Sequence, residues 1–295
     1  MSSATLSVVV ASVNGLPYLA DCLEALEARA PDAEVVVADW TDERTREVVR
    51  TRFPRTTLLS FDEPMAVPEL RAAGIFAATA PYVALIEDHC NVREGWADRL
   101  VAAHEAGQSV VGGSIRNSPY RRVRDWAAFL CEYSRYMEPA PAGAVEDLPG
   151  MNVSYDRRAI EAIDDLLRAG KWESWLHARL LDRGFVLWCE PEAVLDHAKD
   201  FGFSEFLSQR YHYSRSYAGM RNAELGQKRF LYALGAPLIP PLMYMRIARS
   251  VLSRRRNRRE LALATPLILF YMSVWAGGEA IGYVFGGGRS LLRVR

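Results

Sequence analysis

The order of apolar and polar residues in the first 113 positions predicts strands that alternate with helices. Short runs rich in β-branched residues have the length of buried strands, and the segments between them place apolar residues at helical spacing. The strands are expected at 6–11, 34–38, 56–59, 82–86 and 109–112, and the helices at 17–28, 41–50, 68–79 and about 94–106. This alternation predicts an α/β fold with a mostly parallel sheet that is covered by helices on both faces.

The pattern is less regular between residues 114 and 228. Helical spacing near 157–169 and 172–183 is followed by a strand-like run at 185–189, and the Pro/Ala/Gly-rich segment 139–144 is typical of a mobile loop. We expect one domain over residues 1–228, with halves 1–113 and 114–228.

After Lys228 the chain becomes both apolar and basic. Two apolar stretches, at about 230–252 and 261–285, flank the basic segment 253–259. Residues 229–295 contain eleven arginines, no lysine and two glutamates, so a tail of charge +9 balances an acidic remainder and the net charge is zero. A basic tail predicts an anionic partner surface. Its apolar character favours membrane lipid over nucleic acid.

Several arrangements of this tail on a membrane are compatible with the sequence. Two full spans from a cytoplasmic body would place the loop 254–259 outside, against the positive-inside rule. A single span at 261–285 would carry the arginines at 289, 293 and 295 across. A hairpin that enters only the inner leaflet keeps all arginines at the anionic surface, and we rank it first, ahead of one span and then two. A soluble helical subdomain is the non-membrane alternative.

The cysteines and the N-terminus indicate the compartment. Four cysteines lie far apart in the sequence and form no CxxC or metal-finger spacing, which is typical of reduced thiols in the cytosol. They are Cys22, Cys90, Cys131 and Cys189. The segment from Met1 has no basic region of the kind that begins a signal peptide. We therefore expect the body on the cytoplasmic face of the cell membrane.

Acidic residues follow two of the predicted strands. Asp39 ends the second strand and Glu87-Asp88 ends the fourth, so their carboxylates are expected to meet over one crevice at the sheet edge. One carboxylate would accept a hydrogen bond from a ribose hydroxyl, and another would coordinate a divalent cation on phosphate oxygens. The sequence has no GxGxxG and no GxxxxGK[ST] motif, which excludes the usual dinucleotide and P-loop sites.

Six segments in order resemble glycosyltransferase family 2. They are 6–14 (LSVVVASVN, similar to VSVVIPTYN), 35–42 (VVVADWTD, similar to VVVDDGSTD), 69–74 (ELRAAG, similar to A-R-N-x-G), 81–89 (PYVALIEDH, similar to the DxD segment), 150–158 (GMNVSYDRR, similar to G-x-N-x-S-x-R-R) and 172–184, which is similar to the segment that carries the catalytic base. Asp196-His197 also resembles the late histidine of the family. The likeness covers about residues 5–225. It implies a GT-A fold and inverting sugar transfer from a nucleoside diphosphate sugar.

The resemblance assigns donor-binding roles. Ser12 and Asn14 would border the nucleobase, and Asp39 would touch the base or the ribose. Arg71, Glu87 and Asp88 complete the nucleotide-sugar set, with UDP, GDP or dTDP as the nucleotide.

The DxD position departs from the family pattern. Glu87 and His89 stand where the two acids stand, and His197 is a further candidate ligand for the metal. An imidazole among oxygen ligands favours Mn²⁺ over Mg²⁺.

Glu173 is the residue that the resemblance offers as catalytic base. It would take the proton of the acceptor hydroxyl as the oxygen attacks the anomeric carbon, and the nucleoside diphosphate would leave. Asn152 and Trp172 are expected near the acceptor or diphosphate. Arg210 and Arg215, among tyrosines, could bind a diphosphate or a lipid-linked acceptor, or they could form one charged face of a helix.

Purely structural roles are the alternative interpretation of the same residues. Asp39 could cap the following helix, Glu87-Asp88 could be acids at a helix start, and Glu173 could be a solvated helix residue. His177, one turn after Glu173, is expected to be a packing or surface residue.

The acceptor implied by the resemblance would be a glycan or lipid-linked molecule of cell-envelope synthesis. The other two hypotheses are a nucleotidyltransferase and a catalytically silent GT-A-like membrane scaffold.

Overall fold

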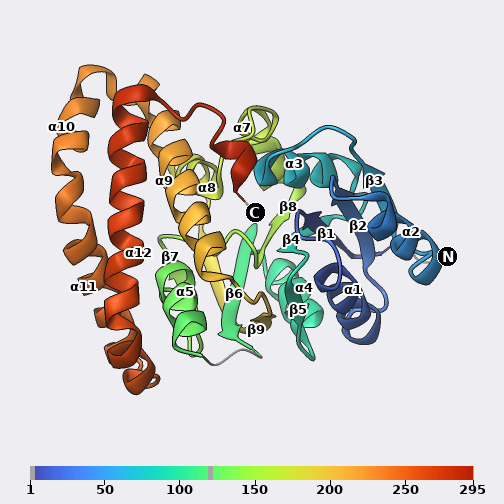
Figure 1. The fold of residues 1–295 in the computed structure, drawn as a ribbon. Coiled ribbons are helices and arrows are strands. Elements are labelled where there is room, and N and C mark those ends of the chain that lie inside the picture. Colours follow the sequence, from blue (N-terminus) through green and yellow to red (C-terminus); the bar gives the residue numbers. More distant parts are fainter. Residues whose placement is uncertain (1–3, 119–121, 295) are drawn as a thin grey trace. The chain divides into compact units, whose positions relative to one another are not determined.

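The chain folds as two compact units, each made of two separate stretches of sequence (Figure 1). The computed structural model describes residues 4–118 and 122–294. Among these, the first unit holds 4–118 and 136–199, and the second holds 122–135 and 200–294. The domain boundary that we expected at residue 228 falls inside the second unit, because the helices before it in sequence pack with the tail helices.

One mixed sheet of nine strands forms the centre of the described part of the first unit. Its order is β3-β2-β1-β4-β8-β6-β9-β5, and β7 pairs with β9. The strands are β1 (Leu6–Ser12), β2 (Glu34–Asp39), β3 (Thr57–Ser60), β4 (Tyr82–Glu87), β5 (Cys90–Val92), β6 (Val110–Asn117), β7 (Gly143–Val145), β8 (Val153–Asp156) and β9 (Leu187–His197). The first four strands in the order are parallel, as predicted. Strand β8 lies antiparallel between β4 and β6, so the rest of the sheet is mixed.

Helices cover both faces of this sheet (Figure 1). The helices of the first unit are α1 (Tyr18–Arg29), α2 (Glu43–Arg52), α3 (Val67–Ala77), α4 (Trp96–Glu105), α6 (Arg157–Ala162), α7 (Asp164–Arg168) and α8 (Glu173–Asp182). Buried side chains of β1, β4 and β8 form one core with α3, α6, α7 and α8. Gly74 lets α3 approach β1 closely, because a Cβ there would lie 2.2 Å from Val9 Cγ1. On the opposite face, α4 reaches β8 through a hydrogen bond between His104 and Ser154.

The second unit consists of helices. They are α5 (Val123–Tyr133), α9 (Phe203–Leu225), α10 (Arg229–Gly235), α11 (Ile239–Ser253) and α12 (Arg258–Phe285), with short 3₁₀ turns at Gly226–Lys228, Ala236–Leu238 and Leu291–Arg293. Helix α12 packs against the other four. Two of its glycines, Gly278 and Gly282, lie against α9, and a Cβ at either would come within 2.5 Å of a carbonyl oxygen of α9.

Both predicted apolar stretches of the tail are helical. By length and composition, the helical stretches Phe203–Ser253 and Arg258–Phe285 are long and apolar enough to cross a bilayer. In the most apolar window of each, 11% and 39% of the residues are buried. Among the described residues, few members of the window in the first stretch are buried, and more of those in the α12 window are.

Candidate functional site

The ends of β2, β1 and β4 lie side by side. Ser12 is opposite Asp39 in one pairing, and Ala11 is opposite Glu87 in the other. The sequence placed acids from two strands at one edge of the sheet, and the pairing brings these strand ends together as expected.

Asp39 is fully buried, and its oxygens accept four hydrogen bonds. The donors are the hydroxyls of Ser12 (2.8 Å) and Thr41 (2.7 Å), the Thr41 amide (3.2 Å) and Arg46 Nε (3.2 Å). These donors fill the roughly four acceptor positions of a carboxylate. A nucleotide contact at Asp39 therefore requires one donor to leave. The following helix is capped by Asp42, which accepts from the Thr45 amide (2.7 Å), so Asp39 is not its cap.

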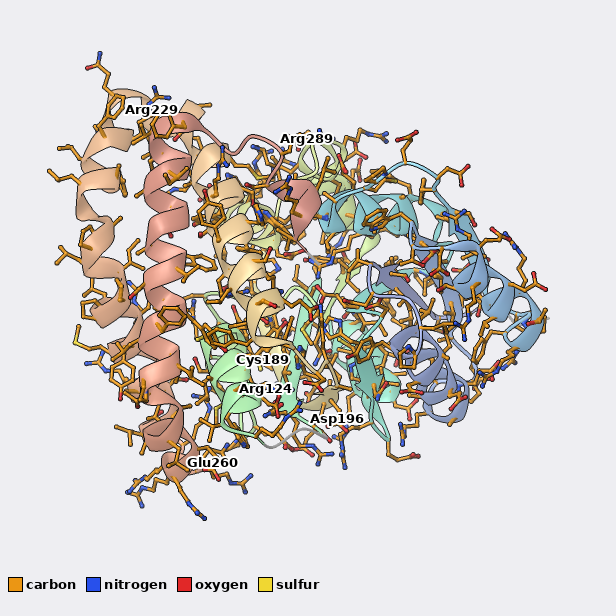
Figure 2. The ribbon with its side chains drawn as sticks, in the orientation of Figure 1. Arg124, Cys189, Asp196, Arg229, Glu260 and Arg289 are labelled. Carbon is orange, nitrogen blue, oxygen red and sulfur yellow. The ribbon has the colours of Figure 1, made fainter. Side chains whose placement is uncertain are left out.

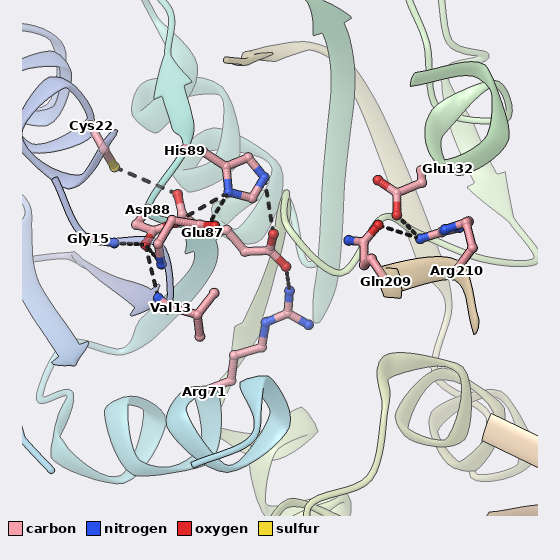
Figure 3. A network of polar contacts seen from close by, with 11 residues as sticks. Val13, Gly15, Cys22, Arg71, Glu87, Asp88, His89, Glu132, Gln209 and Arg210 are labelled. Carbon is pink, nitrogen blue, oxygen red and sulfur yellow. Dashed lines mark hydrogen bonds and ion pairs between the residues drawn. The ribbon is translucent and has the colours of Figure 1, made fainter. Parts of the chain in front are cut away.

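Asp88 points away from Glu87 and into the loop after β1 (Figure 3). Its Oδ2 accepts the backbone amides of Val13 (3.0 Å), Asn14 (2.6 Å) and Gly15 (3.0 Å), and its Oδ1 accepts Asn14 Nδ2 (2.7 Å). Burial raises the pKa of Asp88, but the hydrogen bonds and charge of His89 and the bonds from Asn14 bring it below its ordinary value. Asp88 thus holds the loop that carries Asn14. Its expected direct contact with the nucleotide remains a prediction.

Glu87, His89 and His197 gather beside this loop. His89 Nε2 lies 3.3 Å from Glu87 Oε2, and the rings of His89 and His197 meet edge to face with centroids 4.8 Å apart. His197 reaches this place because Cys90 of β5 pairs with it in β9. Burial, with the nearby His89 and Lys199, holds the pKa of His197 well below its ordinary value, so its ring is neutral.

Arg71 joins the two halves of the predicted site. Its guanidinium is buried on α3, and it donates to Glu87 through one nitrogen and to Glu173 through another. Figure 3 shows its contact with Glu87. A planar guanidinium with five donors suits such bridging between two carboxylates. The bridge places the predicted base on the same arginine as the predicted cation ligand.

Glu173 is the first residue of α8, and 9% of it is exposed. A Cβ on Gly150 would lie 2.5 Å from Glu173 Cδ, so the glycine leaves room for the carboxylate. The alternative interpretation of Glu173 was a solvated helix residue. Its burial against an arginine does not fit that interpretation.

Two other predicted residues have structural partners. Asn152 is fully buried; its amide donates to the carbonyls of Ser114 (3.0 Å) and Ala193 (2.9 Å), and its oxygen accepts Trp96 Nε1 (2.8 Å). Trp172 is the buried residue that precedes α8. Their predicted acceptor or diphosphate roles remain predictions, and the bonds of Asn152 account for its burial without a ligand.

Arg210 and Arg215 belong to the second unit and have partners there. Arg210 is buried on α9, pairs with Glu132 (Figure 3) and lies over aromatic rings, including that of Phe206 at 4.8 Å. Arg215 Nε donates to the Gly286 carbonyl (3.2 Å) at the end of α12. Both contacts stabilise the helical unit. A phosphate contact by either arginine remains a prediction.

The sequence did not indicate the bonds of two polar groups of the first unit, although packing was one of the two roles expected for His177, which is buried. Arg46 binds Asp39, and His177 bonds Tyr155 and Asp147 in the interior. The only sequence signal for His177 was its place one turn after Glu173, which puts the two side chains on the same face of α8.

The sequence model described as "Glycosyl transferase family 2" matches residues 7–163, which is more than half of the chain. The chain belongs to glycosyl transferase family 2. The search of curated proteins found no match.

Solved glycosyltransferases share the fold of this family 2 enzyme. A mannosyltransferase from Pyrobaculum calidifontis, in complex with GDP-mannose and Mn²⁺, superposes with a TM-score of 0.58 at 15% identity, over 93% of this chain and 86% of that one. Residues 1–349 of S. aureus TarS give 0.52 at 13% identity, over 94% and 89%. GalNAc-T7, solved with UDP, GalNAc and Mn²⁺, gives 0.50 at 13%, over 67% and 44%. The GT-A-like fold expected from the sequence is confirmed, and the chain is a glycosyltransferase.

The residues of the enzyme fit a cation that arrives with a diphosphate. Among the described residues, no group of three or more His, Cys, Asp and Glu side chains forms a metal site by itself. Glu87 and His89 nevertheless converge as one oxygen and one nitrogen donor. Divalent cations at phosphate sites often take only one or two protein ligands and complete their shell from phosphates and water. His197 stands beside this pair as the third candidate.

Proposed function

We propose that this enzyme transfers a sugar, with inversion, from a nucleoside diphosphate sugar to a hydroxyl of a glycan or lipid-linked acceptor at the cytoplasmic face of the membrane. The observation that carries the proposal is the buried bridge from Glu87 through Arg71 to Glu173. It connects the proposed base to the proposed cation ligand within one family 2 fold. Ser12, Asn14 and Asp39 at the strand ends would border the base and ribose of UDP, GDP or dTDP.

Glu173 performs the chemical step in this proposal. Its carboxylate accepts the proton of the acceptor hydroxyl while the oxygen attacks the anomeric carbon and the bond to the diphosphate breaks. Arg71 orients Glu173, because its guanidinium donates a hydrogen bond to the carboxylate. Glu87 and His89 would hold a divalent cation, which when bound neutralises charge on the diphosphate; the nitrogen ligand favours Mn²⁺.

A donor panel tests the proposal. With Mn²⁺ present, we expect one nucleoside diphosphate sugar to raise the melting temperature, and membrane extract to support transfer. Glu173→Gln should retain the thermal shift and lower turnover by roughly 100-fold or more, because general base catalysis contributes about 10²–10⁴. Asp182→Asn, at the exposed end of the same helix, is the matched control and should keep full turnover. No shift with any nucleotide, or full activity of Glu173→Gln, would refute the assignment.

An exposed apolar stripe on the second unit supports membrane attachment. It runs along α10, the 3₁₀ turn Ala236–Leu238 and α11, and its members are three, four or seven residues apart, the spacings that keep side chains on one side of a helix. They are Leu231, Leu234, Leu238, Leu242, Met245 and Leu252. Leu231 is 70% exposed and Leu234 is 79% exposed. Apolar side chains in such a continuous row are typical of an interaction surface.

Arginines adjoin this stripe and favour an anionic bilayer as its partner. Arg246 and Arg249 interrupt the face of α11. The exposed residues Arg255 and Arg256 lie in the turn before α12, and the exposed Arg258 and Arg259 begin that helix. Glu260, labelled in Figure 2, marks that end of the unit, and Arg229 marks the other. Each basic residue near an anionic surface adds about 1 kcal/mol of attraction. A second copy of the chain is a poorer partner for the stripe, because its own arginines would repel those of the first copy.

Vesicle co-sedimentation tests this surface. We expect binding to vesicles that contain phosphatidylglycerol, and weak binding to vesicles of phosphatidylcholine alone, with attraction that declines as salt rises. Leu234→Glu should release the protein. The same change at Leu181, an exposed leucine of the first unit, should not. Binding that survives Leu234→Glu, or a dimer that Leu234→Glu dissociates, would remove the membrane assignment of the stripe.

A further inference from the structure

A chain of three polar side chains, two of them buried, lies in the first unit and has no part in the step described above. The hydroxyl of Tyr155 on β8 lies 3.1 Å from His177 Nε2 on α8. His177 Nδ1 lies 2.9 Å from Asp147 Oδ1. Tyr155 is fully buried and His177 is 2% exposed, whereas the Asp147 side chain is 29% exposed and reaches solvent.

The partners of Asp147 fix the direction of these bonds. Besides His177, Asp147 accepts the Leu148 amide at Oδ1 (3.0 Å) and the Tyr136 hydroxyl at Oδ2 (2.5 Å). An ionised carboxylate can only accept, so its bond to His177 requires a proton on Nδ1. In the tautomer that carries its proton on Nδ1, Nε2 accepts the Tyr155 hydroxyl. Burial raises the pKa of Tyr155 and the charge of Glu173 raises it further, so the phenol remains a donor.

The chain surrounds the helical turn that begins with Glu173. Glu173 and His177 are separated by four residues on α8, so they project from one face on successive turns. The segment 147–150 contacts both: Asp147 binds the histidine, and Gly150 lies against the Glu173 carboxylate. Tyr155 anchors the same face to the sheet. The segment 147–150 and the strand β8 therefore both contact the first turns of α8.

We propose that His177 is a positioning residue, which uses its bonds to Tyr155 and Asp147 to hold the first turn of α8, and with it Glu173, in register with Arg71. The proposal rests on the proposed function, in which Glu173 is the base. Removing the bonds of His177 lets the turn shift, and a displacement of about 1 Å at a reacting group can lower turnover by roughly 100-fold.

His104 provides a matched control for burial and bonding. It is 5% exposed, and it bonds Ser154 Oγ (2.8 Å) and the Gln108 carbonyl (2.7 Å). Ser154 precedes Tyr155 in β8, so the two histidines approach the same strand from opposite faces. His104→Phe and His177→Phe each remove two hydrogen bonds of a buried histidine. Only those of His177 lie beside Glu173.

The kinetic test compares His177→Phe and Tyr155→Phe with His104→Phe in the full-length enzyme. We expect kcat per donor-binding site to fall on the order of 100-fold for His177→Phe and Tyr155→Phe, with KM for the donor unchanged. His104→Phe should keep kcat, and His177→Gln, which retains a donor and an acceptor, should recover part of the loss. Wild-type kcat in His177→Phe, or an equal loss in His104→Phe, would overturn the proposal.

A second measurement does not depend on turnover. In the wild type, ¹⁵N spectra should show a proton on Nδ1 and none on Nε2 of His177. Amide hydrogen exchange at residues 173–177 should accelerate in His177→Phe and not in His104→Phe. If no donor–acceptor pair is turned over, the proposed function fails, and these readings still decide the positioning role. A proton on Nε2, or unchanged exchange in His177→Phe, would contradict it.

Discussion

Asp88 is the residue on which the loop after β1 depends. Three successive backbone amides point at one of its oxygens, and the loop carries Asn14 to the strand-end site. Consecutive amides of this kind form a concave anion site, and here the protein fills it with its own carboxylate. The shape of this loop therefore follows from an acid that directly succeeds the neighbouring strand β4.

We expect Asp88→Asn to destabilise the first unit by about 2 kcal/mol, because an amide cannot accept from all these donors and leaves buried N–H groups unsatisfied. The urea midpoint should fall with an unchanged slope. Asp32→Asn, an exposed aspartate in the turn before β2, is the control and should change the midpoint little. Equal midpoints for both variants would show that Asp88 does not support the loop.

At this scale the sequence predicted the types of residue in the site better than their partners. Order along the chain placed Asp39, Glu87 and Glu173 in one fold. It could not show that Asp39 accepts four internal bonds or that Arg71 bridges two acids, because these contacts join residues up to 102 positions apart. Such contacts depend on side-chain directions that one sequence does not reveal.

Close packing of α12 on α9 is the main contact of the helical unit. Gly278 and Gly282 are one turn apart, and both face backbone atoms of α9. Glycines at this spacing let two helices approach until their backbones touch. The adjacent Gly277 has open space where a Cβ would be placed, so it has no such task.

Two alanine substitutions should therefore have opposite effects. Gly282→Ala would place a methyl group 2.5 Å from the Arg215 carbonyl oxygen, and we expect a loss of about 1–3 kcal/mol from overpacking. Gly277→Ala should stabilise α12 by up to about 1 kcal/mol, since alanine is the better helix former. Thermal unfolding followed by circular dichroism measures both. A stabilised Gly282→Ala would mean that the helices are not held at this distance.

Elements with strong periodicity were predicted from the sequence, whereas the short strands and the helices α5 and α9 were not. The strands β1 to β4, the helices between them and the apolar tail helices are confirmed within a few residues. Strands β5 and β7 have three residues each and form only through pairing with β9, so local sequence contains no signal for them. The strand predicted at 185–189 continues to His197, through a segment that contains Pro191.

At the scale of the whole molecule, burial lowers the pKa of several histidines, which favours their neutral form in the folded state. Burial lowers the pKa of His104, and the pKa of His212 is also lowered by burial and by nearby arginines. In the unfolded chain these side chains titrate near a pKa of about 6.5. Below that pH the unfolded state binds more protons than the folded one, so stability is present at neutral pH and is lost on acidification.

We expect the free energy of unfolding to fall between about pH 7.5 and about pH 5.5, the window set by the ordinary histidine pKa. His104→Phe should be less stable at pH 7.5 but show a flatter dependence, because one proton-linked group has been removed. Urea titrations at several pH values measure the slope. A variant with the same slope as the wild type would exclude His104 as a source of the acid sensitivity.

The divided second unit has a consequence during synthesis. Helix α5 is complete at Tyr133, but α12, against which it packs, ends only at Phe285. At about 5–20 residues per second, a ribosome needs roughly 8–30 s to make the intervening chain. For that time the apolar face of α5, which includes Phe129 and Leu130, has no native partner from the tail. The nascent chain thus offers chaperones a binding site that disappears once translation is finished.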